Sequence, residues 1–174
     1  FTWDIFLFGA EADSIPGVNL SGLTDANDFS SPDGMWFDDR GVLWLQTDDG
    51  AYTDTTNCMM LAALPGSVSD GSVQTATAGT GTQKTPMGAK LDDSKLRRFL
   101  VGPAGCEITG VTMTPDYKAI FVNVQHPGGT WPANQAEHLI STGRAYSRPR
   151  SATVVITRKD GGVIAGESLE TPKA

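Results

Sequence analysis

Acidic side chains at the ends of short apolar segments are the residues of this chain that could carry chemistry. Glu107 directly precedes an apolar segment, and Asp33 lies at the start of an equivalent segment earlier in the chain. Carboxylate oxygens suit hard cations such as calcium. Asp48, which ends the segment after Asp33, is a further candidate ligand. Carboxylates that converge on one point could hold two cations, and such a pair stabilises both the attacking and the leaving oxygen of a hydrolysis.

Each of these carboxylates also has an ordinary structural explanation. A glutamate can close a strand or cap a turn, and the aspartate of a Pro-Asp-Gly sequence, such as that at Asp33, is a favoured turn residue. Asp48 stands in a Thr-Asp-Asp-Gly sequence, which also favours a turn. We expect metal binding at Glu107, whereas ligand and turn roles both remain open for Asp33 and Asp48.

Three further side chains could act on a phosphate group. Arg148 and Arg150 flank a proline just before an apolar segment, and the planar fork of a guanidinium matches two phosphate oxygens. His126 ends another apolar segment, where an imidazole could bind a metal or act as a general acid. These three residues are candidates for catalysis. The structural alternatives are a solvated arginine and a His-Pro turn packed at a strand end.

No nucleophile elbow of the Gly-x-Ser-x-Gly type, P-loop or Cys-x-x-Cys pair occurs in the sequence. Its two cysteines, Cys58 and Cys106, could form a disulfide outside the cytoplasm, but we expect them to be buried thiols. With 13 basic and 20 acidic residues the chain has a net charge of −7, which would repel nucleic acid. No apolar run is long enough to cross a bilayer. We therefore expect neither nucleic acid nor a membrane as a partner.

The elements that must position these side chains are short strands joined by many turns. The chain contains 20 glycines and 10 prolines, and it shows no long helical pattern. Two stretches look like copies of one β-hairpin, in which an apolar strand, a turn and a second apolar strand follow one another. The predicted strands are 31–38 with 42–48 in the first copy and 107–114 with 119–124 in the second.

Further apolar segments extend each hairpin to four strands. Residues 58–64 and 96–101 would complete a unit at about 31–103, and residues 151–157 and 163–165 would complete a unit at about 105–166. Four antiparallel strands per repeat are typical of a β-propeller blade. We therefore predict an all-β fold with about two blades, preceded by residues 1–10 as the outer strand of another blade.

Two segments do not fit a compact blade. Residues 65–94 are rich in Gly, Ser, Thr and Ala without periodicity, which predicts a flexible surface excursion, and residues 127–149 form a second long loop. Two blades cannot close a ring. The chain also begins at Phe1 without an initiator Met. We therefore expect a partial propeller domain over 1–174 that pairs with the remainder of a larger propeller or self-associates through its open blade edges.

Four sequence stretches in order carry a family resemblance: 31–50, 97–116, 121–129 and 148–162. Together they resemble the closing blades of PhoX-type alkaline phosphatases. The resemblance implies a six-bladed propeller with calcium and iron at one mouth of the channel, held mostly by carboxylates. It also implies hydrolysis of phosphomonoesters in a periplasmic or secreted protein, and it supports Glu107, within Gly-Cys-Glu-Ile-Thr-Gly, as a metal ligand.

The sequence thus favours the C-terminal part of a metal-dependent phosphatase whose substrate is a phosphate ester. Because two blades offer only part of a metal site, we expect the chain alone to be inactive. One alternative is another calcium-dependent propeller hydrolase, for instance a lactonase-like enzyme. The other is a propeller that binds a partner and catalyses nothing.

Overall fold

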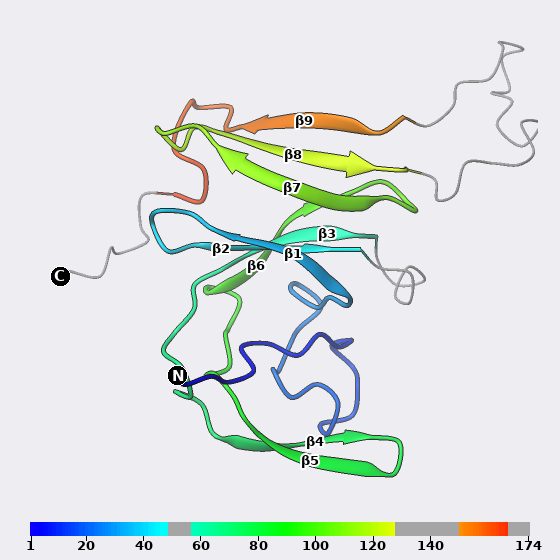
Figure 1. Ribbon diagram of the computed structural model, residues 1–174. Coiled ribbons are helices and arrows are strands. Elements are labelled where there is room, and N and C mark those ends of the chain that lie inside the picture. Colours follow the sequence, from blue (N-terminus) through cyan, green and yellow to red (C-terminus); the bar gives the residue numbers. More distant parts are fainter. Residues whose placement is uncertain (49–56, 128–149, 167–174) are drawn as a thin grey trace, which may run out of the picture.

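A computed structural model describes residues 1–48, 57–127 and 150–166 of the chain (Figure 1). These residues contain no α-helix, and thus none that could cross a membrane. They form nine strands in three antiparallel sheets, which confirms the prediction of an all-β, propeller-like fold. The strands are β1 (Pro32–Phe37), β2 (Leu43–Thr47), β3 (Met59–Ala63), β4 (Val73–Ala78), β5 (Gly81–Pro86), β6 (Leu96–Val101), β7 (Glu107–Met113), β8 (Ala119–Gln125) and β9 (Ala152–Thr157).

The first sheet has the strand order β1-β2-β3-β6 and contains the strands expected for the unit at 31–103. The turn between β1 and β2 is stabilised by its own residues. The carboxylate of Asp38 accepts hydrogen bonds from the backbone N–H groups of Arg40 and Val42, and Gly41 supplies the positive φ of 81° that the turn requires.

The excursion between β3 and β6 corrects one expectation. Residues 65–94 were predicted to lack structure, but they contain the antiparallel hairpin of β4 and β5. The strands are rich in threonine, which favours extended backbone, and most of their side chains are exposed. A hairpin that leaves both faces largely exposed has no hydrophobic alternation, so the sequence carried no periodic signal for it.

The N-terminal segment corrects a second expectation. Residues 1–10 were predicted to form the outer strand of a preceding blade, yet they make only isolated bridges, between Ile5 and Met87 and between Ala10 and Phe29. The backbone of Ile5 bonds to Pro86 and Gly88 at the base of the β4–β5 hairpin, and no ladder continues from it. Two apolar side chains of this segment, those of Phe6 and Leu7, pack instead against the core on one face of the first sheet.

The third sheet has the order β7-β8-β9 and lacks the fourth strand predicted at 163–165. The chain turns after β9, and Ile164 inserts its side chain into the core between the sheets. Its N–H donates to the carbonyl of Tyr117, and its carbonyl accepts from Nη1 of Arg40. These contacts use the backbone groups that a ladder beside β9 would need. Residues 163–165 therefore do not form the predicted fourth strand but fill part of the core through the side chain of Ile164.

The third sheet stacks on the first, with β7 nearest to it (Figure 1). Cys58 and Cys106 lie in the core between them as buried thiols rather than as a disulfide, as expected. The core consists of Val42, Trp44, Cys58, Met60, Cys106, Ile108, Ile120, Val122 and Ile164. The division of the chain into propeller blades stays a prediction.

Candidate metal centre

Asp48, Glu107 and His126 meet at one end of the two stacked sheets. A carboxylate oxygen of each acid and a ring nitrogen of His126 lie within 4.8 Å of one another. The topology brings them together, because Glu107 starts β7 opposite Gln125 at the end of β8, which His126 follows directly. Asp48 comes immediately after β2, and β2 packs against β7.

Glu107 is the most buried member of this cluster, with 9% of its surface exposed. Burial raises the pKa of its carboxyl group, the nearby carboxylates of Asp48 and Asp33 raise it further, and His126 opposes them. Three acidic groups thus repel one another at this end of the sheets. A bound cation would relieve that repulsion and would favour the ionised form of Glu107.

His126 is held in place by hydrogen bonds to residues just before β9 and β7. Its N–H donates to Oγ of Ser151 at 3.0 Å, and its ring Nδ1 lies 3.2 Å from the carbonyl oxygen of Gly105. Because a carbonyl oxygen only accepts, we assign the ring proton to Nδ1. Nε2 faces Oε2 of Glu107 at 3.5 Å, as the donor of an ion pair when the imidazole is protonated and as a second acceptor when it is neutral. Two acceptors in this arrangement favour a cation that both can share.

The backbone of His126 adopts a φ of 36°, in the left-handed region that non-glycine residues rarely occupy. Such strained positions persist only where the surroundings hold them, and they concentrate at functional sites. Here the bonds to Ser151 and Gly105 supply the restraint. Sequence reasoning missed both of these supporting residues, because neither belongs to a pattern that predicts such a contact.

Cys106 precedes Glu107 but does not join the cluster. Burial raises the pKa of its thiol to about 11, and the neighbouring Cys58 and Glu107 add to that effect. A thiol with this pKa stays protonated at neutral pH, whereas metal ligation requires the thiolate. In the arrangement described, Cys106 serves as a buried apolar residue of the core.

The other predicted site residues lie around this cluster or outside the described residues. Asp33 is exposed and close enough to act on the pKa of Glu107, but it does not belong to the three converging ligands. Arg150 is exposed directly before Ser151, whose hydroxyl holds His126. Arg148 and most of the predicted loop 127–149 lie outside the described residues.

The chemistry of the converging groups fits a metal ion. Two carboxylates and one imidazole with an available nitrogen suit iron, which accepts both ligand types, and the carboxylates alone suit calcium. Both of these ions take more ligands than the three that this chain supplies. The arrangement is therefore part of a coordination shell that further protein groups, water or substrate oxygens would complete.

Comparison with known proteins identifies the family of the chain. The sequence profile described as alkaline phosphatase PhoX matches residues 1–128. Among solved structures, the chain is similar to Pseudomonas fluorescens PhoX in complex with vanadate, a transition state analogue, at 37% identity and a TM-score of 0.51. That match covers 79% of this chain and 19% of the other. No curated protein matches. The extent of the profile match and the identity to a solved PhoX together establish that this chain belongs to the alkaline phosphatase PhoX family.

Proposed function

We propose that this chain supplies part of the active site of a metal-dependent enzyme that hydrolyses phosphomonoesters. The observation that carries the proposal is the convergence of Asp48, Glu107 and His126 within 4.8 Å in a chain of the PhoX family. The relative was solved with vanadate, described as a transition state analogue, which supports phosphoryl chemistry. Because the chain covers 19% of that relative, remaining ligands would come from the rest of the propeller or from self-association.

In this proposal Glu107 and Asp48 hold a cation through their carboxylates, and His126 binds it through Nε2. Calcium and iron are the proposed ions, and when bound they would polarise the phosphate oxygens and stabilise developing charge. Asp33 adds negative charge beside Glu107 and so favours cation binding. Arg150, together with Arg148, would brace the phosphoryl oxygens through bidentate hydrogen bonds. Gly105 and Ser151 keep His126 oriented.

The test uses the full-length parent protein and p-nitrophenyl phosphate, with added calcium and iron. Glu107→Gln keeps the shape of the side chain but removes its charge, so metal content should fall and turnover should drop by about two orders of magnitude. Asp13→Asn, an exposed acid on the N-terminal segment, is the control and should change neither. Normal metal content and turnover in Glu107→Gln would rule out Glu107 as a ligand.

Three outcomes separate the functions that the sequence allows. Phosphatase activity that needs retained metal supports the proposal. Retained metal with lactone hydrolysis and no phosphatase activity would indicate a lactonase-like hydrolase, and absence of bound metal would indicate a binding scaffold. The isolated chain should show little turnover under all conditions, since a partial coordination shell holds the ions weakly and does not position the substrate. We also propose that the parent is periplasmic or secreted, which fractionation of cells would test.

A further inference from the structure

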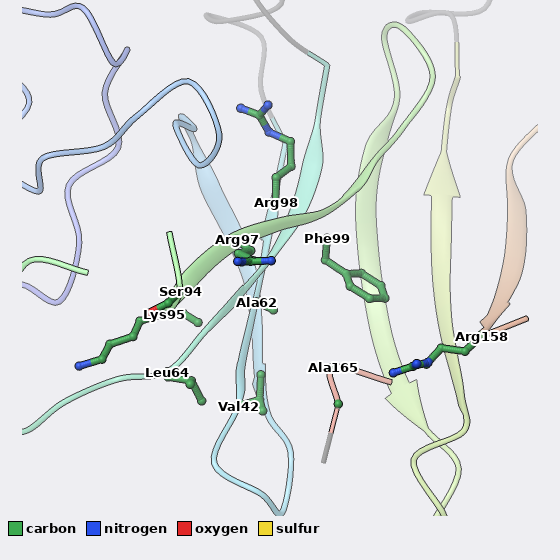
Figure 2. A pocket seen from close by; sticks show the side chains of 12 residues that line it. Val42, Ala62, Leu64, Ser94, Lys95, Arg97, Arg98, Phe99, Arg158 and Ala165 are labelled. Carbon is green, nitrogen blue, oxygen red and sulfur yellow. The ribbon is translucent and has the colours of Figure 1, made fainter. Parts of the chain in front are cut away.

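A cavity of about 410 Å³ lies away from the metal centre, between the outer part of the first sheet and the turn after β9 (Figure 2). Its volume falls in the range of sites that hold small molecules. The apolar part of its lining comes from Val42, Ala62, Leu64, Phe99 and Ala165. None of the described residues that line it is acidic, although the chain as a whole has a net charge of −7. The charged residues of the lining are thus all basic, whereas the protein as a whole is negatively charged.

Arg97 is the central cation of this cavity. It lies on β6 opposite Ala62 of β3, which in turn lies opposite Trp44 of β2, so the three side chains share one face of the sheet. Alternation along β6 sends Arg98 to the other face, where it pairs with Asp28. Figure 2 shows Arg97 above Ala62 and to one side of Phe99, with Arg98 pointing away from both.

The guanidinium of Arg97 is oriented but not neutralised by the described part of the chain. Its Nε donates to the carbonyl of Asp93 at 2.6 Å, which fixes the plane of the group. No carboxylate of residues 1–48, 57–127 or 150–166 forms an ion pair with it. The two terminal nitrogens of an arginine held in this way can bind both oxygens of one oxyanion.

Arg158 places a second cation on the opposite wall. Its Nε and Nη2 pair with Asp160 at 3.0 and 2.6 Å, so the group is restrained rather than mobile. Lys95 also belongs to the lining, but it points away from the other cations (Figure 2). The positive potential of the cavity therefore comes from Arg97, with Arg158 as a partly neutralised neighbour.

The ring of Phe99 gives the cavity its apolar wall. Phe99 is half-buried and meets the buried Trp44 in an edge-to-face contact with the ring centroids 4.9 Å apart. That contact fixes the ring beside Arg97. We infer that this cavity binds a small organic oxyanion, a carboxylate or phosphate group on a ring-sized apolar body, with the oxyanion on Arg97 and the body against Phe99.

The test is a titration of the full chain, with EDTA present so that metal-bound phosphonate does not contribute. Benzoate and phenylphosphonate are the probes, and ¹H–¹⁵N spectra report the binding. Saturable shifts at Arg97, Phe99 and Ala165 are expected with at least one probe, and the comparison shows which oxyanion is preferred. Inorganic phosphate should bind at least tenfold more weakly than phenylphosphonate, because it cannot use the apolar wall.

Matched variants decide the result. Arg97→Gln should weaken binding about tenfold through loss of charge-assisted hydrogen bonds, and Ala62→Leu should weaken it by filling the cavity. Lys84→Gln, an exposed cation on the β4–β5 hairpin, should bind as the unaltered chain does. Unchanged spectra away from the cavity show that each variant is folded.

Absence of saturable shifts at millimolar probe, or equal binding by Arg97→Gln, would overturn the inference. So would binding that appears only after deletion of residues 167–174, because the acidic residues Glu167 and Glu170 would then be the natural occupants of the cavity.

Discussion

Nε2 of His126 lies 3.5 Å from Oε2 of Glu107, although Glu107 starts β7 and His126 follows the end of β8. The antiparallel pairing of β7 and β8 fixes this separation, since Glu107 and Gln125 are opposite each other in the ladder. The bond from Nδ1 to Gly105 then sets which nitrogen faces the carboxylate. The pairing of β7 with β8 and the carbonyl of Gly105 thus determine how Glu107 and His126 can bind one cation together.

Asp48→Asn should weaken calcium binding to the isolated chain by at least about fivefold, because it removes one of the two charged ligands. Asp13→Asn is its matched control, since both positions are exposed aspartates but only Asp48 lies in the cluster. Isothermal titration calorimetry of the metal-free chain measures the effect. Equal calcium affinity in the two variants would remove Asp48 from the proposed ligands.

Glu107→Gln should raise the melting temperature of the metal-free chain at neutral pH. The pKa of Glu107 is raised in the folded state by burial and by Asp48 and Asp33, so its stabilising contribution is present at low pH and is lost as pH rises through that raised pKa. The advantage of the variant should therefore grow between about pH 4 and pH 7. Saturating calcium should reverse the order. Thermal unfolding in EDTA that shows the same pH dependence for both proteins would contradict this account.

The two cysteines should react slowly with iodoacetamide in the native chain at mildly alkaline pH. Cys58 and Cys106 are each only 2% exposed, and burial raises the pKa of Cys106 to about 11, so little thiolate is present. Mass spectrometry of the alkylated chain should find rapid labelling of both only in denaturant. Fast labelling of Cys106 under native conditions would mean that the core between the sheets opens readily.

Asp38→Asn should destabilise the chain by about 3–5 kcal/mol, as expected when a buried ion pair loses one partner. The side chain of Asp38 is fully buried, and it bonds to Arg40 at 2.7 Å and to the indole N–H of Trp44 at 3.2 Å. Asp160→Asn, which removes the exposed partner of Arg158, is the control and should have little effect. Urea unfolding measures both, and similar midpoints for the two variants would refute the prediction.

The hydrophobic pattern of the sequence predicted the strands that bury one face. It failed for strands that are exposed, and for segments whose conformation depends on contacts with residues distant in the chain. The hairpin of β1 and β2 was accessible to sequence reasoning because apolar alternation and a glycine turn coincide there. The β4–β5 hairpin was not, because threonine-rich exposed strands carry no hydrophobic signal. Residues 163–165 have the composition of a strand, but the carbonyl of Ile164 accepts a hydrogen bond from Arg40 and is therefore not available to a neighbouring strand.

The candidate site divides in the same way. Glu107 and Asp48 could be proposed from residue type and position at strand ends, and His126 could be proposed from its place at the end of an apolar segment as a metal ligand or a general acid. The supporting roles of Ser151 and Gly105 depend on the approach of β9 and of the turn before β7 to one histidine. Such long-range backbone contacts leave no trace in a single sequence.

The contact between Arg40 and Ile164 spans 124 positions of the chain and closes the core between the sheets. During synthesis the first sheet emerges long before Ile164, with the face that carries Val42 and Trp44 still open to water. Loop closure over such a distance is slow, and apolar surface exposed in the meantime attracts other chains. A ribosome-bound chain truncated before Ile164 should therefore depend on chaperones, and one that extends past the turn after β9 should depend on them less.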